Sequence, residues 1–233
     1  MLEQLGQDIW SAQTIQPIGG GVRFPARMVI IRLADGLWIH SPIPIDDALA
    51  AEIEALGEVR YLVSPNCFHH LHLGPAQARW PQAQVHAPAG LAAKRPDLTI
   101  HVTHEAGAQP WPEFAPLVEI EGVPEIDEFV FLHQPSKTLV LCDLSFNMRD
   151  VEGFMSRLAL RLAGAWQRTA QSKLWRVITK DRAAAGASCA RVLALDFERA
   201  LVSHGDPIEG PDAKAKLQEA LSWMLSAHQD NAA

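Results

Sequence analysis

A chain of 233 residues with 48% hydrophobic and 20% charged residues has ample apolar surface for one large globular domain or two small ones. Its formal net charge of −7 argues against a generic nucleic-acid-binding protein, because such proteins carry an excess of cationic side chains. The three cysteines are widely spaced and form no CxxC pair, which argues against a cysteine-only zinc site and a disulfide framework.

The N-terminal residues contain no basic stretch followed by an apolar run, so we expect no signal peptide. No segment reaches about 18 apolar residues without charge, so we also expect no membrane span. With no sign of a disulfide framework, these features predict a cytoplasmic protein.

The first half of the chain alternates strand and helix signals. Residues 28–33 and 37–40 are β-rich and flank Asp35-Gly36, so we predict a hairpin, approached by a flexible glycine triplet at 19–21. An aspartate at 46 or 47 can cap a helix that ends near Leu56. Further along, we predict strands at 59–63 and 84–87 and short helices at 75–80 and 89–94.

The middle of the chain is β-rich and the last third is helical. We predict strands at 99–103, 117–121, 128–133 and 137–142, then helices at 151–167, 171–178 and 184–195. A short strand at 199–203 precedes a terminal helix that runs to about His228, with Leu217, Leu221 and Met224 on one face. The sequence contains no GxGxxG and no GxxxxGK[ST] motif, so nothing indicates a glycine-rich nucleotide loop.

Histidines gather where the predicted strand 59–63 ends. His69, His70 and His72 lie within four residues, and two later predicted strands end in the same manner, at Asp143 and at His204. Loops at strand ends commonly carry chemistry, and imidazole is the commonest metal ligand in proteins. The other histidines, among them His40, His86 and His104, are expected to be structural or surface residues.

The segment between Arg149 and Arg191 is basic, with nine cationic and three acidic residues in an otherwise acidic chain. Arg157, Arg161 and Arg168 share one helical face, and apolar residues within 155–166 share another. One interpretation is a solvated surface helix. The other is a helical cap that draws an anionic substrate, docks a partner or meets an anionic membrane surface. No interleaved aromatic residues indicate a nucleic-acid channel, and the apolar face would equally serve a homodimer contact.

In order and position, these features resemble the metallo-β-lactamase fold and, more closely, the DUF4336 family of its degenerate members. The stretch 64–72 lies where that fold carries its HxHxDH metal motif. Residues 136–144 resemble the strand whose terminal aspartate bridges two metals, here Asp143, and 203–207 resemble the late His-Gly loop, here His204. The resemblance covers about Val22 to Trp223. It implies an α/β fold, the αββα four-layer sandwich, in a single domain over 1–233 with a basic helical insert at about 149–191.

The metal motif itself departs from the family pattern. In the register that we favour, because the strand end then falls at its usual place, Pro65 and Cys67 replace the first two histidines. His69 then replaces the aspartate, and His70 alone survives. A register shifted by two instead aligns Cys67, His69, Leu71 and His72. Residues 122–128 offer only carboxylates where a further histidine is expected, so a dinuclear zinc hydrolase is not implied.

A reduced metal site is the expectation that remains. His70, Asp143 and His204, helped by His69 or His72, would supply three or four nitrogen and oxygen ligands, with Asp143 and His204 as the catalytic pair. Zn²⁺ is expected, or Mn²⁺ or Fe if Asp127 or Glu128 adds oxygen ligands, with Asp206 orienting a histidine.

Two functions follow from this expectation. The first is metal-dependent hydrolysis of a small ester, thioester, lactone or phosphoester, with no nucleic-acid partner. The alternative is a metal-free, non-catalytic relative that binds partners through the basic segment.

Overall fold

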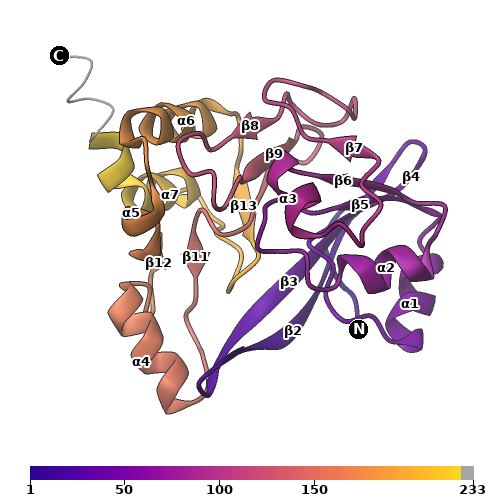
Figure 1. The fold of residues 1–233 in the computed structure, drawn as a ribbon, viewed down its shortest axis with the longest axis horizontal. Coiled ribbons are helices and arrows are strands. Elements are labelled where there is room, and N and C mark those ends of the chain that lie inside the picture. Colours follow the sequence, from indigo (N-terminus) through magenta and orange to yellow (C-terminus); the bar gives the residue numbers. More distant parts are fainter. Residues whose placement is uncertain (227–233) are drawn as a thin grey trace.

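The computed structural model describes residues 1–226, which fold into four layers, helix, sheet, sheet and helix (Figure 1). A seven-stranded sheet carries three helices on its outer face, and a four-stranded sheet carries two helices on the opposite outer face. The αββα arrangement expected from the resemblance is therefore confirmed.

The first sheet begins as an antiparallel meander and continues as parallel strands. Its order follows the chain: β1 (Glu3–Gly6), β2 (Ile9–Gly19), β3 (Val22–Leu33), β4 (Gly36–His40), β5 (Val59–Val63), β6 (Gln84–Ala87) and β7 (Val102–Thr103). From β4 onward the strands are parallel, so their carboxyl ends lie at one edge.

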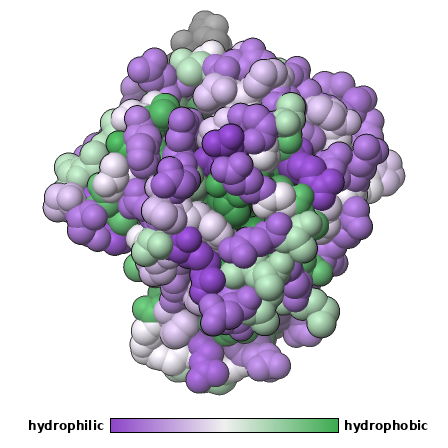
Figure 2. All heavy atoms as spheres, turned by 90° about the vertical axis from the view of Figure 1, so that its right-hand side faces the viewer, coloured by the Kyte–Doolittle hydropathy of each residue, from purple (hydrophilic) through white to green (hydrophobic). Residues whose placement is uncertain are grey.

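Three helices cover the outer face of this sheet: α1 (Asp47–Glu54), α2 (Leu73–Arg79) and α3 (Ala89–Lys94). The predicted cap of α1 is Asp46, whose side chain accepts a hydrogen bond from the backbone N–H of Leu49 at 2.8 Å. The surface over these helices is largely hydrophilic, as Figure 2 shows, which fits a layer that faces solvent.

The second sheet has the order β13-β10-β9-β8. Its strands are β8 (Val118–Glu119), β9 (Phe129–His133), β10 (Thr138–Leu141) and β13 (Arg199–Val202), and α6 (Arg182–Ala194) and α7 (Ala213–Ala220) pack on its outer face. Strands β10 and β13 are parallel, with Leu141 opposite Val202. The carboxyl ends of β10 and β13, which are far apart in the sequence, therefore lie side by side.

The space between the sheets holds an aromatic core. Trp38, Trp111, Phe114 and Phe131 are fully buried there, with edge-to-face or tilted rings. Leu217, Leu221 and Met224 are buried as predicted, but α7 ends at Ala220, so the helix is interrupted there instead of running on unbroken. Its predicted end at His228 lies outside the described residues.

The basic segment 149–191 is less helical than predicted. A two-stranded sheet pairs β11 (Phe146–Asn147) with β12 (Thr169–Ala170), and between them lies α4 (Phe154–Ala163); α5 (Leu174–Ile178) follows β12. Helix α4 is shorter than the predicted 151–167 because Gly164 closes it in the left-handed conformation, with a φ of +74°. That the basic segment 149–191 is an insert remains a prediction. A homodimer contact through the apolar face of its helix also remains a prediction.

The N-terminal strands differ from the sequence expectation. Residues 9–19 form the long strand β2, and the glycine triplet that we expected as a flexible approach is the tight turn between β2 and β3. All three glycines have positive φ, which other residues rarely adopt. Over residues 1–226, no helix combines the length and apolar character needed to cross a bilayer.

Candidate metal centre

Three strand ends converge at the edge between the two sheets. His69 lies in the loop after β5, whereas Asp143 and His204 each lie two residues beyond the paired ends of β10 and β13. The parallel register of β10 and β13 therefore places Asp143 beside His204, and the packing of the first sheet on the second brings His69 to them.

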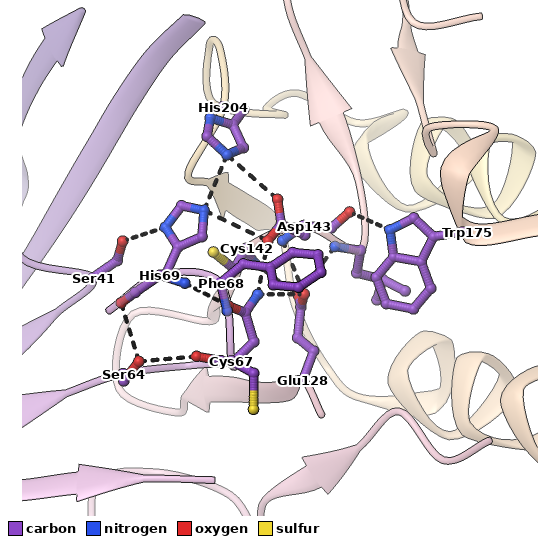
Figure 3. A network of polar contacts seen from close by, with 12 residues as sticks. Ser41, Ser64, Cys67, Phe68, His69, Glu128, Cys142, Asp143, Trp175 and His204 are labelled. Atoms are coloured by element: carbon purple, nitrogen blue, oxygen red, sulfur yellow. Dashed lines mark hydrogen bonds and ion pairs between the residues drawn. The ribbon is translucent and has the colours of Figure 1, made fainter. Parts of the chain in front are cut away.

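The two imidazoles and the carboxylate face one another (Figure 3). His69 Nε2 lies 3.0 Å from His204 Nε2. Asp143 reaches both rings, with Oδ2 at 3.5 Å from His69 Nε2 and Oδ1 at 3.4 Å from His204 Nε2. The three side chains are between 10% and 13% exposed, so the cluster is shielded but open to a small molecule on one side.

The outer nitrogen of each ring is already occupied. His69 Nδ1 lies 2.7 Å from Ser41 Oγ, and His204 Nδ1 lies 2.8 Å from the carbonyl oxygen of Pro25. Because a carbonyl only accepts, His204 Nδ1 must carry the proton, and in the neutral ring Nε2 then holds a lone pair. Metal-binding histidines are usually oriented in this way: one ring nitrogen makes a hydrogen bond, and the other ring nitrogen remains free to bind the metal.

Asp143 is held by a buried amide and a buried carboxylate. Asn66 Nδ2 donates to Asp143 Oδ2 at 2.9 Å and to Glu128 Oε2 at 3.1 Å. The Glu128 carboxylate also accepts the backbone N–H groups of Cys142, Asp143 and Leu144 at 2.9 to 3.1 Å. Glu128 therefore fixes the backbone that carries Asp143.

Charge pairing sets the ionisation of the cluster. Burial alone would raise the pKa of Asp143, but the imidazoles of His69 and His204 outweigh it, and the pKa lies well below its ordinary value. Burial alone would lower the pKa of His204, yet the contact with Asp143 raises it. Burial and then the charge of Asp143 raise the pKa of Glu128. Asp143 therefore holds its negative charge more strongly than Glu128 does.

Gly205 fixes the loop that carries His204. Its φ is +106°, and a Cβ atom at this position would lie 2.3 Å from the backbone oxygen of Asn147. The fully buried Arg27 ties the same loop to β3, since its backbone N–H donates to Ser203 O at 2.8 Å and its Nη2 donates to Gly205 O at 2.9 Å. The loop is therefore anchored to both sheets.

A thiol adjoins the cluster. One ligand atom from each of His69, Cys142 and Asp143 lies within 4.8 Å of the others. Cys142 is fully buried, and burial, reinforced by the charges of Asp143 and Glu128, raises the pKa of its thiol. It is therefore a neutral neighbour of the imidazole and carboxylate groups in the described structure.

Comparison with known proteins identifies the family. A family model described as a domain of unknown function (DUF4336) matches residues 6–153, more than half of the chain. The chain belongs to the DUF4336 family. No curated protein matches it.

Solved structures similar to this DUF4336 protein include several metallo-β-lactamases. The enzyme from Pontibacter korlensis has a TM-score of 0.67 at 14% identity, with 97% of this chain and 98% of that chain covered. The enzyme from Hirschia baltica has a TM-score of 0.65 at 12% identity, with 94% and 96% covered. That from Erythrobacter litoralis has a TM-score of 0.60 at 14% identity, with 98% and 92% covered. At these identities the likeness shows the metallo-β-lactamase fold alone.

The structure brings only one member of the DUF4336 histidine cluster to Asp143. His70 Nδ1 instead accepts a hydrogen bond from Arg95 at 2.8 Å, and His72 Nε2 lies 3.0 Å from Gln16 Oε1. The favoured register, in which His70 was the surviving ligand, therefore does not describe the geometry. Of the five expected ligands, the structure brings His69, Asp143 and His204 together, and His70 and His72 have other partners.

Two further expectations for the family motif are corrected. Asp206 is exposed, and the group that orients His204 is the carbonyl of Pro25. Asp127 does not approach the cluster, because its carboxylate accepts the backbone N–H of Gly90 at 3.0 Å. Glu128 reaches the centre, but its oxygens bind backbone and amide donors.

Sequence reasoning missed Ser41, Pro25 and Cys142 as parts of the centre. Ser41 and Pro25 have no local signal, because a hydroxyl after β4 and a carbonyl within β3 become partners only when the loops dock. Cys142 directly precedes Asp143, and its place beside a candidate ligand was the one available signal.

Proposed function

We propose that this protein is a metal-dependent hydrolase in which His69, Asp143 and His204 hold one metal ion. The observation that carries the proposal is the mutual approach of His69 Nε2 and His204 Nε2 at 3.0 Å, each within 3.5 Å of an Asp143 oxygen. Two imidazoles and a carboxylate, with an open side, are the donor set of a catalytic zinc site.

The residues present fit such an ion. Both Nε2 atoms and both carboxylate oxygens point to a common region, and the outer ring nitrogens are engaged elsewhere. Zn²⁺ suits the nitrogen-rich set, and Mn²⁺ or Fe is the alternative if a substrate or water oxygen completes it. The ion supplies Lewis-acid chemistry at the carbonyl or phosphoryl group of a small substrate.

The protein groups have distinct roles in this proposal. Asp143, kept ionised by the two imidazoles, binds and orients the ion, and His204 presents a lone pair fixed by Pro25. His69 completes the set from the opposite sheet, held by Ser41. The substrate class is a small ester, thioester, lactone or phosphoester.

Elemental analysis of protein purified without chelator tests the proposal. We expect about one equivalent of metal in the wild type and a loss of at least about 80% in a His69→Ala, His204→Ala double variant. His70→Ala is the matched control, because His70 is the adjacent imidazole and binds Arg95 instead. Thermal unfolding of each variant separates loss of the ligands from loss of the fold.

The contrary result is equally clear. A folded wild type that contains no metal and takes up neither added Zn²⁺ nor Mn²⁺ would overturn the hydrolase proposal. That result would favour the second function, a metal-free relative that binds partners through the basic segment 149–191.

A further inference from the structure

A cavity of about 370 Å³ opens at the candidate metal centre, with His69, Asp143 and His204 in its wall. This volume falls within the range of small-molecule sites. The rest of the wall is mainly apolar, and its apolar residues include Phe24, Ile43, Phe68, Phe146 and Leu174. The candidate metal centre supplies polar groups to this wall, and Gln16, His72 and Ser172 supply the others.

The wall provides no cation for an anionic substrate. Among the described residues that line the cavity there is neither a lysine nor an arginine. Recognition of a carboxylate or phosphate group normally uses arginine or lysine. The basic side chains Arg157 and Arg161 of α4 are exposed but do not line the cavity. The wall thus disfavours the anionic substrate that was one interpretation of the basic segment.

The mouth of the cavity is apolar and exposed to solvent. Leu71 and Ile18 are each 58% exposed, Leu174 is 51% exposed and Phe68 is 39% exposed, and all four line the cavity. They come from the β2–β3 hairpin end, the His69 loop and α5, three separate parts of the fold. Large apolar side chains gathered around an opening indicate a site that binds an apolar group.

From these observations we infer that the cavity binds the uncharged, apolar acyl group of an ester or thioester, with the carbonyl carbon beside His69, Asp143 and His204. The inference rests on the proposed hydrolase function for its reaction. Water forms a C–O bond to the carbonyl carbon and the ester C–O or thioester C–S bond breaks. The proton from water passes to the leaving alkoxide or thiolate, so that a carboxylic acid and an alcohol or thiol are released.

Binding of a neutral fluorophore tests the apolar site without any reaction. The probe is N-phenyl-1-naphthylamine, whose emission rises in apolar surroundings, added to the full chain. Leu174→Glu places a charge at the mouth and is expected to weaken binding at least tenfold. Val177→Glu, on the same helix and 82% exposed but outside the cavity wall, is the matched control and is expected to stay within twofold of the wild type.

Hydrolysis of paired esters tests the substrate class. The neutral ester is 4-nitrophenyl butyrate, and its anionic counterpart of similar length is mono-4-nitrophenyl succinate. We expect kcat/KM to be at least tenfold higher for the neutral ester in the wild type, and kcat/KM for the neutral ester to fall in Leu174→Glu but not in Val177→Glu.

The outcomes separate this inference from the proposed function. A protein that contains metal and hydrolyses the anionic ester better would overturn the apolar-substrate inference and leave the hydrolase proposal standing. A metal-free protein that hydrolyses neither ester, yet binds the fluorophore with the Leu174-specific loss, would overturn the hydrolase proposal and support the apolar site. Equal fluorophore binding by both glutamate variants and the wild type would overturn the inference.

Discussion

Glu128 acts on the candidate metal centre through the backbone. Its buried carboxylate accepts the N–H groups of three successive residues, Cys142 to Leu144, as well as the amide of Asn66. A neutral side chain of the same shape would satisfy only part of this set, because one of the two oxygens would become an N–H₂ group that faces donors. The carboxylate is therefore needed to keep the loop after β10 in place.

Replacement of Glu128 by glutamine should thus destabilise the fold. We expect Glu128→Gln to lower the free energy of unfolding by at least about 2 kcal/mol, because buried donors lose their acceptor. Glu125→Gln is the control, since Glu125 makes an ion pair with Lys180 at the surface and such pairs contribute about 0 to 1 kcal/mol. Urea unfolding measures both, and equal stability of the two variants would contradict the role given to Glu128.

Asn66 explains why the side chains of His69 and His70, which are neighbours in the sequence, point in different directions. Its Oδ1 accepts the backbone N–H groups of Phe68 and His69 at 2.9 Å, which forms a tight turn after β5. This turn directs His69 inward, whereas His70 faces Arg95 on the other side. The sequence predicted a histidine cluster, but the direction of each ring depends on this turn and on docking partners that are distant in the chain.

At the scale of secondary-structure elements, the loop after β13 depends on Gly205. We expect Gly205→Ala to lower the free energy of unfolding by about 1 to 3 kcal/mol, because the residue has positive φ and the added Cβ would meet the Asn147 backbone. Metal content should fall as well, because His204 lies next to the strained position.

Gly210→Ala provides the matched comparison for this loop. Gly210 also has a positive φ, +94°, but its added Cβ would meet only the side chain of Asp212, at 3.4 Å. Thermal unfolding and metal analysis of both variants give the comparison. The same loss in both variants would show that positive φ alone matters and that the close approach to Asn147 does not.

Elements with regular patterns could be predicted, and edge elements could not. The hairpin of β3 and β4, the strand β5 and the capped helix α1 follow from local turn, burial and capping signals, and all are confirmed. Strand β2 was missed because its outer half is exposed and contains Pro17, which weakens a strand signal. The three strand ends that carry the candidate site could be predicted, because in each of them an apolar run ends in polar residues.

At the scale of the whole molecule, buried imidazoles between the sheets make stability depend on pH. His86 and His104 are 3% and 5% exposed, and in the described structure both nitrogens of His86 and Nδ1 of His104 have no hydrogen-bond partner. Burial lowers the pKa of His86 to about 4 and that of His104 to about 3, with nearby His101 and His86 adding to the respective shifts. The folded protein therefore holds these rings neutral.

Acid should accordingly destabilise the fold. Below the ordinary histidine pKa of about 6.5 the unfolded chain binds protons that the folded protein binds only near pH 3 to 4, so stability falls as the pH falls through this window. For His86 alone the loss is on the order of 3 kcal/mol between pH 7 and pH 4.

A variant of His86 isolates this contribution. His86→Leu should flatten the dependence of the unfolding free energy on pH between 7 and 4, because it removes one of the buried imidazoles whose pKa is lowered. His101→Leu is the comparison, since the exposed His101 adds only the smaller part of the shift at His86 and should flatten the dependence less. Curves for His86→Leu that run parallel to those of the wild type would contradict the assignment.

The dual anchoring of the His204 loop also bears on how the protein folds. His69 and His204 are 135 positions apart in the chain, and Arg27 and Pro25 of β3 hold the loop that carries His204. Loop closure over such a separation is among the slower events in folding, because its entropy must be lost before any contact compensates. Binding of a metal ion by His69, Asp143 and His204 would therefore require that the two sheets have already packed together. The rate at which folding protein gains the ability to bind metal would then measure the rate of this packing step.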